Sequence, residues 1–195
     1  MTGRIEAKLA ELAVTLPPPV APIANYVPYV ITGNLVVISG QIPVVDGKVA
    51  FTGKLERQIS VAEGQRAARQ CFVNVLAQLK AACGGDLDRV TRVVRLGGFI
   101  ACPPDFTQHA IVMNGASDLA VAVFGDAGKH ARSTIGVPSL PADAAGEISG
   151  VEFQDGVLTI HLAKKAAPNR EDGGAADHSQ SGNPGGGKGA CGAET

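Results

Sequence analysis

The sequence predicts one α+β domain, in which a mixed β-sheet packs with two helices. The chain has 195 residues, of which 45% are hydrophobic and 18% charged, and this is enough for one compact domain and tight for two. Apolar and valine-rich runs predict strands, and they are grouped around two longer segments with helical character. Glycine, proline, Asp-Gly and Asn-Gly separate these segments, as expected of turns.

The N-terminal segment predicts a short amphipathic helix. Ile5, Leu9 and Leu12 recur there at helical spacing among charged residues. Prolines at 17–19 end this helix. We assign residues 1–18 to the helix and a proline-rich linker.

A buried strand, a hairpin and a long helix follow. The run at 35–38 is continuously apolar and lies between glycines, which is typical of a buried strand. Asp46-Gly47 supplies the positive φ angles of a hairpin turn. Ser60 and Glu63 have the spacing of a capping box, and the apolar stripe behind them predicts a helix that Gly84-Gly85 ends.

The second half of the domain predicts further strands and a second helical region. Segment 89–100 is rich in valine with arginines between, so we expect a strand with one solvated face and a bulge at Gly97-Gly98. The helical region at 105–124 is expected to divide at Asn114-Gly115, with Ser117 capping its second piece. Strands are also predicted over 132–137, 147–153 and 157–162, with an Asp155-Gly156 hairpin before the last.

Charge and hydropathy exclude several classes of protein. The 17 basic and 18 acidic side chains leave a net charge of −1, so the chain lacks the positive field that binding to a nucleic-acid backbone requires. No window approaches the roughly 20 apolar residues that span a bilayer, and the N-terminus has no signal-peptide core. We therefore expect a soluble cytoplasmic protein with no nucleic-acid or membrane partner.

The cysteines and the C-terminal segment carry no metal motif. Cys71, Cys83, Cys102 and Cys191 have no C-x-x-C spacing, so they suggest neither zinc nor a disulfide framework. After Leu162 no large aliphatic or aromatic residue recurs, so residues 163–195 are predicted to be a disordered glycine-rich tail. Metal binding is not expected from the irregularly spaced set of His161, His178 and Cys191.

Residues 26–43 read YVPYVITGNLVVISGQIP, which resembles the pattern Y-S-x-A-V-x-x-G-N-L-V-x-x-S-G-Q-x-P. That pattern is the opening signature of the reactive-intermediate deaminase (Rid, YjgF-like) family, formerly labelled endoribonuclease L-PSP, which this segment therefore resembles. Residues 131–143, ARSTIGVPSLPAD, resemble A-R-S-x-V-x-V-x-x-L-P, and Glu147 follows the arginine at the family's spacing. The resemblance runs from about residue 19 to residue 153, and we assign 19–162 to a Rid-like domain.

This resemblance implies a fold and an activity. The implied fold is a chorismate-mutase-like α+β sheet packed with two helices, which assembles into a homotrimer with ligand clefts between neighbouring subunits. The implied activity is cofactor-independent hydrolysis of 2-imino acids and their enamine tautomers to 2-keto acids and ammonia. The expected partners are small 2-imino and 2-keto acids and other copies of the chain.

The resemblance also implies site residues whose chemistry suits this reaction. The Arg132 guanidinium can hold a substrate carboxylate through two parallel hydrogen bonds, and the Glu147 carboxylate can orient water and shuttle protons. Tyr26 resembles the family tyrosine that closes the cleft. Ser39 and Gly40 end the buried strand, where a missing Cβ lets the backbone approach a ligand.

Two further candidates depart from the family pattern. Thr134 stands where better-known members have a cysteine, and its backbone groups could still serve the substrate. Asn114 lies eighteen rather than seventeen residues before Arg132. Gly146 and Gly150 interrupt the alternation of the closing strand, so we expect them to weaken the strand that carries Glu147.

Two other functions remain open at this level. The same pocket could belong to a non-catalytic trimeric module that binds a small carboxylate or a protein partner. Ribonuclease activity is disfavoured by the near-zero charge and the few aromatic residues, and a basic surface around Arg89, Arg92 and Arg95 would favour it.

Overall fold

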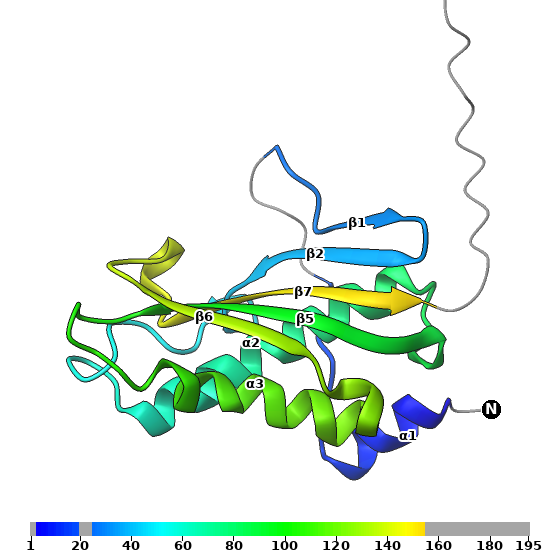
Figure 1. The fold of residues 1–195 in the computed structure, drawn as a ribbon, viewed down its shortest axis with the longest axis horizontal. Helices are drawn as coiled ribbons and strands as arrows, with labels where there is room; N and C mark the ends of the chain where they lie inside the picture. Colours follow the sequence, from blue (N-terminus) through cyan, green and yellow to red (C-terminus); the bar gives the residue numbers. More distant parts are fainter. Residues whose placement is uncertain (1–2, 20–24, 155–195) are drawn as a thin grey trace, which may run out of the picture. The chain divides into compact units, whose positions relative to one another are not determined.

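A five-stranded mixed β-sheet is covered on one face by two helices (Figure 1). The structure, a computed structural model, describes residues 3–19 and 25–154. The strands β5 and β6 are parallel and the other neighbours are antiparallel. In spatial order the strands are β1 (Tyr29–Thr32), β2 (Leu35–Gln41), β7 (Gly146–Gln154), β5 (Val90–Ala101) and β6 (Ala131–Val137).

The helices are α1 (Arg4–Glu11), α2 (Val61–Ala82) and α3 (His109–Phe124). Short 3₁₀ turns lie at η1 (Leu87–Arg89), η2 (Gly125–Gly128) and η3 (Pro141–Asp143). The predicted hairpin is confirmed as β3 (Val44–Val45) and β4 (Lys48–Val49), with φ of 48° at Asp46 and 76° at Gly47.

Helix α2 begins at the capping box that the sequence predicts. The Ser60 hydroxyl accepts a hydrogen bond from the Glu63 backbone N–H at 3.3 Å, and the Glu63 carboxylate accepts one from the Ser60 N–H at 2.8 Å. These bonds satisfy backbone donors that the first helical turn leaves unpaired. The helix ends before Gly84, whose φ is 68°, as expected from the glycine pair.

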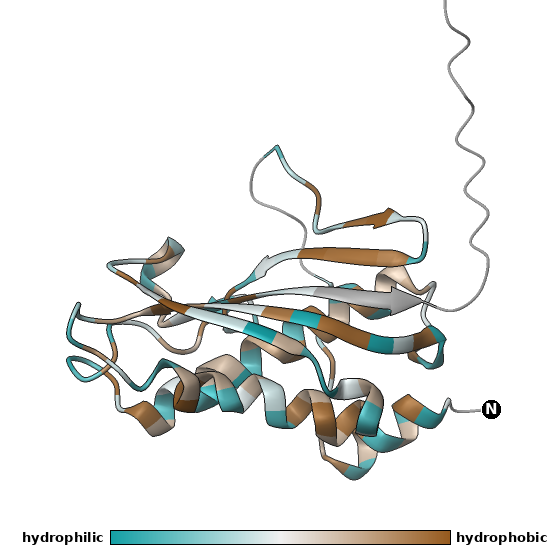
Figure 2. Ribbon diagram, viewed as in Figure 1, coloured by the Kyte–Doolittle hydropathy of each residue, from teal (hydrophilic) through white to brown (hydrophobic). Residues whose placement is uncertain are grey.

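Strand β2 is buried on one face rather than on both. Val36 and Ile38 are 0% and 1% exposed, whereas Val37 between them is 41% exposed. Continuous apolar sequence suggested burial, but the helices cover only one side of the sheet. Val37 pairs with the exposed Val30 of β1, so apolar side chains lie on the sheet face opposite the helices, called the outer face below. Figure 2 colours β1 and much of β2 as hydrophobic.

Strand β5 has no bulge at Gly97-Gly98, contrary to the prediction. Its register with β7 shifts instead between Val90 and Arg92 and between Val93 and Arg95. The glycines serve close packing: a Cβ on Gly98 would lie 2.6 Å from the Met113 sulfur, and one on Gly97 would lie 3.0 Å from the Ser149 hydroxyl.

Helix α3 starts at His109 and runs unbroken through Asn114-Gly115, so the prediction of two shorter pieces is wrong. A Cβ on Gly115 would lie 1.9 Å from the Gln65 carbonyl oxygen of α2. The glycine therefore lets the backbones of the two helices approach closely, and this tertiary packing outweighs its low helix propensity.

We expect Gly115→Ala to destabilise the fold by about 1 to 3 kcal/mol, because the added methyl group must push the two helices apart. Helix propensity alone predicts the opposite, a gain of about 1 kcal/mol. Urea unfolding followed by circular dichroism distinguishes the two outcomes. The Ala122→Gly variant, at an exposed position of the same helix, calibrates the propensity effect; a stabilised Gly115→Ala protein would contradict this account of the packing.

Helix α1, expected from the N-terminal pattern, shares the core of the sheet domain. Its Ile5 and Leu9 side chains are 1% and 4% exposed and belong to the main hydrophobic cluster. The Asp88 carboxylate accepts hydrogen bonds from the Arg4 and Ile5 N–H groups at 2.6 and 2.9 Å. A carboxylate from a distant turn therefore caps the helix, which has no side-chain cap of its own.

Strand β7 is continuous, although two glycines were expected to weaken it. It lies between β2 and β5 and pairs with both, and Ile148 is 2% exposed.

The stretch His109–Gly128, which includes α3, is long and apolar enough to cross a membrane by length and composition alone, contrary to the sequence expectation. In this fold its apolar face packs into the core through Val112, Met113 and Ala120.

The remaining predictions for the C-terminal end lie outside the described residues. They are the Asp155-Gly156 hairpin, the strand at 157–162, the tail at 163–195 and the set of His161, His178 and Cys191.

Candidate active site

Arg132 lies near the start of β6 and its side chain reaches helix α3. Its register partner on the parallel strand β5 is Leu96, which is fully buried beneath the helices. The Arg132 Nη1 group donates hydrogen bonds to Asn114 Oδ1 at 2.9 Å and to Ser117 Oγ at 3.2 Å. The structure thus brings together Arg132 and Asn114, both predicted from the sequence.

Sequence reasoning missed the polar residues that continue this network. Ser117 was predicted as a helix cap, but its hydroxyl lies 3.1 Å from His130 Nε2. His130 Nδ1 lies 2.6 Å from the Gly128 carbonyl, which can only accept, so Nδ1 carries a proton in this bond. Ser117 can therefore accept from Arg132 while donating to His130. The spacing of Asn114 and Ser117, one helical turn apart, was the signal available in the sequence.

The Arg132 guanidinium retains donors for a ligand. Both of its hydrogen bonds use Nη1, and the side chain makes no ion pair with any residue in 3–19 or 25–154. Two residues along β6 on the same face, Thr134 Oγ1 is shielded from solvent and has no hydrogen-bond partner in that part of the chain. Donors on Nε and Nη2 are available to a polar ligand, whereas the shielded Thr134 hydroxyl is out of a ligand's reach with the side chains placed as they are.

Glu147 projects from the opposite face of the sheet. It alternates along β7 with the buried Ile148, and its register partner on β5 is Phe99. A Cβ on Gly40 would lie 1.8 Å from Glu147 Oε1, so the space for the carboxylate depends on the glycine. In this structure the Glu147 side chain occupies the space that the missing Cβ leaves, and a close approach of a ligand to Gly40 stays a prediction.

The Glu147 carboxyl is half-buried, and this burial raises its pKa above the ordinary value. A carboxyl with a raised pKa is a better base once ionised and is protonated more often at neutral pH. Such a group suits the transfer of protons in both directions.

Ser39 precedes Gly40 in β2 and is bonded to the segment just before β1, which carries Tyr26. The Ser39 hydroxyl donates to the Val27 carbonyl at 2.7 Å, and the Ser39 N–H donates to the Pro28 carbonyl at 3.0 Å. These bonds hold the segment that carries Tyr26, which is 50% exposed, against the end of β2. The Ser39 hydroxyl thus fixes the position of the backbone next to Tyr26.

We expect Gly40→Ala to displace the Glu147 carboxylate, because the new methyl group would overlap it. Any activity that depends on Glu147 should fall by at least about tenfold in kcat with a smaller change in KM. Steady-state kinetics of the variant beside a Thr32→Ala variant, at an exposed position at the end of β1, checks this. Unchanged kcat in Gly40→Ala would show that the carboxylate position is unimportant.

The candidate residues form two separate groups within one chain. The Arg132 group (Arg132, Asn114, Thr134, Ser117 and His130) lies on the helix side of the sheet at β6. The Glu147 group (Glu147, Gly40, Ser39 and Tyr26) lies at β2 and β7. Strand β5 separates β6 from β7, which places the strands about 10 Å apart, and the key side chains project from opposite faces. One small molecule cannot touch both groups of the same chain.

The comparisons with known proteins identify the family of this chain. The family model described as "YjgF/chorismate mutase-like, putative endoribonuclease" matches residues 6–149. The chain belongs to this family. The resemblance stated from the two sequence motifs is thereby confirmed, as is a mixed α+β fold, with α1 as a third helix.

Relatives within the YjgF family cover most of the domain. The chain is 46% identical to Protein TCP17 of Trypanosoma cruzi over 151 residues, which are 77% of this chain and 94% of that protein. It is 48% identical to Atu1372 of Agrobacterium tumefaciens, a protein of unknown function, with a TM-score of 0.73 over 78% of this chain and 94% of that one. It is 26% identical to E. coli TdcF with bound serine, with a TM-score of 0.51 over 70% and 93% of the two chains.

The family description also names an endoribonuclease, and a basic surface around Arg89, Arg92 and Arg95 would favour that activity. The Arg89 guanidinium donates to the Cys83 carbonyl at 3.0 Å, and that of Arg95 donates to the Ser133 hydroxyl. These hydrogen bonds to neutral groups occupy some donors of Arg89 and Arg95, and both side chains keep their charge.

Proposed function

We propose that this protein hydrolyses 2-imino acids to 2-keto acids and ammonia, at a site that two copies of the chain complete. The observation that carries the proposal is the Arg132 guanidinium, exposed, held in place by Asn114 and Ser117, and without an acidic partner in the described part of the chain. A guanidinium in this state can bind a planar carboxylate through two parallel hydrogen bonds.

Glu147 supplies the proton transfers in this mechanism. Water attacks the imine carbon while the Glu147 carboxylate takes a proton from it, and the carboxyl then gives that proton to the nitrogen. The resulting carbinolamine loses ammonia as its hydroxyl proton moves to the nitrogen, which leaves the 2-keto acid. The raised pKa of Glu147 suits both halves of this cycle.

A symmetric assembly would bring the two groups together. The outer face of the sheet carries the exposed apolar side chains Val30, Val37 and Ile135, which are 51%, 41% and 53% exposed. Apolar side chains gathered on one face favour a protein partner. A homotrimer, as the family resemblance implies, would place the Arg132 group of one copy against the Glu147 group of the next.

Serine bound to the related TdcF supports a small amino-acid-like ligand for this site. The second candidate is a non-catalytic module that binds a small carboxylate at the same place. The same Arg132 guanidinium supports this candidate, because it can bind a carboxylate whether or not a reaction follows. The non-catalytic module predicts ligand binding without faster release of ammonia.

Ammonia release tests the proposal. An amino-acid oxidase generates 2-imino acids from a panel of amino acids, and ammonia is measured with and without the protein. The proposed deaminase accelerates release, with a preference for small side chains. Binding of 2-keto acids without acceleration would assign the non-catalytic module instead.

A further inference from the structure

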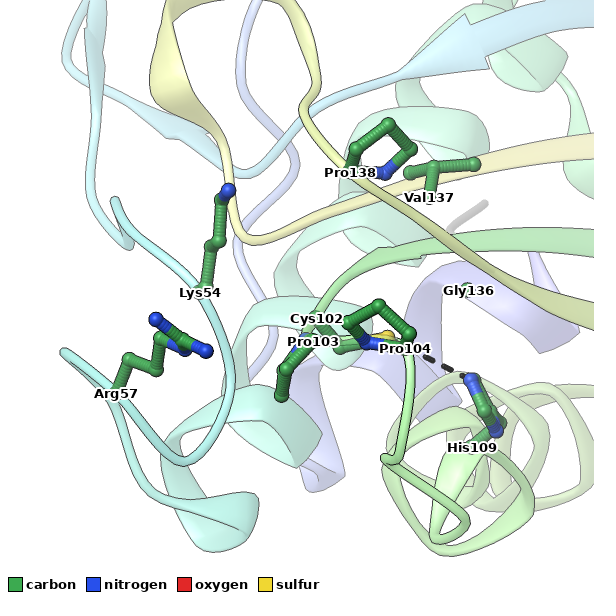
Figure 3. A pocket seen from close by; sticks show the side chains of 9 residues that line it. All are labelled: Lys54, Arg57, Cys102, Pro103, Pro104, His109, Gly136, Val137 and Pro138. Carbon is green, nitrogen blue, oxygen red and sulfur yellow. Dashed lines mark hydrogen bonds between the residues drawn. The ribbon is translucent and has the colours of Figure 1, made fainter.

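A cavity lies at the opposite end of β6 from Arg132. It has a volume of about 600 Å³ and is bounded by the carboxyl ends of β5 and β6, the start of α3 and the loop at 53–60. Its lining residues are Lys54, Arg57, Cys102, Pro103, Pro104, His109, Gly136, Val137 and Pro138 (Figure 3). This volume is within the range of small-molecule sites.

The charge of this cavity is unbalanced. Lys54 and Arg57 extend from the loop on one side, and none of the described residues that line the cavity is acidic (Figure 3). Neither side chain makes an ion pair or a side-chain hydrogen bond with a residue in 3–19 or 25–154. Glu56, which lies between them in sequence, is instead bonded to the Gln108 amide at 2.9 Å.

The loop that carries the two cations is held firmly in place. The Leu55 N–H donates to the Ala101 carbonyl at the end of β5 at 2.9 Å, and the Leu55 side chain is 0% exposed. The Gln58 side chain accepts from the Lys54 N–H at 2.8 Å, and the Lys54 carbonyl accepts from the Arg57 N–H at 3.1 Å. The backbone positions of both cations are therefore preorganised, which lowers the entropic cost of binding a ligand.

The opposite wall combines apolar surface with one polar pair. Four apolar residues of this wall can contact the carbon skeleton of a ligand, namely Pro103, Pro104, Val137 and Pro138. Cys102 Sγ lies 3.5 Å from His109 Nε2, and the missing Cβ of Gly136 makes room for both, since it would lie 2.7 Å and 2.6 Å from these atoms. The wall thus offers a small polar end beyond the apolar surface.

We propose that this cavity is a second ligand site, which binds a small organic dianion, a phosphate monoester or a dicarboxylate. The two cations face the anionic group, the proline-rich wall contacts the organic part, and the Cys102–His109 pair meets its far end. The site is independent of the proposed deaminase chemistry, because it shares no residue with the Arg132 or Glu147 groups.

Calorimetric titration of the full-length protein tests this proposal with two probes, inorganic phosphate and malonate, at constant ionic strength. We expect saturable binding of at least one probe, and the tighter probe assigns phosphate or dicarboxylate chemistry. The Lys54→Ala/Arg57→Ala double variant should bind at least about tenfold more weakly, because it loses both charge-assisted contacts.

The control is the Lys48→Ala/Arg92→Ala variant, which removes the same charge from exposed positions outside the cavity. We expect its affinity to stay within about twofold of the unmodified protein, since distant surface charges are screened. Arg132→Ala should also bind normally, which separates this site from the deaminase site. The proposal is overturned if neither probe saturates, or if the control variant loses as much affinity as the test variant.

Discussion

The Arg132→Ala variant is expected to lose about 100-fold to 1,000-fold in kcat/KM for 2-iminopropanoate, because truncating a charged, hydrogen-bonded partner in a closed site costs about 2 to 5 kcal/mol. In the proposed mechanism the guanidinium holds the substrate carboxylate, and Asn114 and Ser117 restrain it from the α3 side. Ammonia release from oxidase-generated imino acids measures the loss.

Two companion variants make this result specific. Arg132→Lys keeps the charge but not the planar fork of donors, so its kcat/KM should fall between those of the wild type and the alanine variant. Arg92→Ala removes an exposed arginine of β5 outside both residue groups and should leave the rate unchanged. A wild-type rate in Arg132→Ala would refute the proposed mechanism.

The Glu147→Gln variant is expected to lower kcat by about 100-fold to 10,000-fold, the usual contribution of general acid–base catalysis. It should also make the protein more stable at neutral pH. Burial raises the pKa of this carboxyl in the folded state, so the folded protein binds more protons than the unfolded one between the ordinary value of 4.5 and the raised value. Stability contributed by this group therefore falls as pH rises through that window.

The stability gain of Glu147→Gln should be absent at pH below the ordinary carboxyl pKa and largest above the raised one. Urea unfolding at acidic and neutral pH measures both limits. A variant that is inactive but less stable than the wild type at neutral pH would show that the carboxylate has a stabilising partner, contrary to the desolvation account.

Mixing the two inactive variants tests the division of the site between chains. If the chain forms the proposed homotrimer, co-expression of Arg132→Ala and Glu147→Gln chains in equal amounts gives about one quarter of interfaces that pair an intact Arg132 with an intact Glu147. Activity should therefore recover to about a quarter of the wild-type value. If both groups acted within one chain, no mixture would recover activity.

Local pattern was sufficient for most elements. The capping box at Ser60 and Glu63, the Asp46-Gly47 turn and the stripe of α2 depend on residues close in sequence, and all three are present. The failures involve distant partners. Gly115 does not break α3 because it meets the Gln65 carbonyl, and Gly97-Gly98 makes no bulge because side chains from other elements pack against it.

By itself, the sequence determined the family, the order of the described helices and of every strand except β1, and the identities of Arg132, Asn114 and Glu147 as candidates, because these depend on motifs and spacing along the chain. Only the tertiary structure decided which candidates meet. It joined Ser117 and His130 to Arg132, and it placed Glu147 across the sheet with Gly40. The physical reason is that strand register and side-chain alternation, which assign each residue to a face of the sheet, are set by pairing between distant segments.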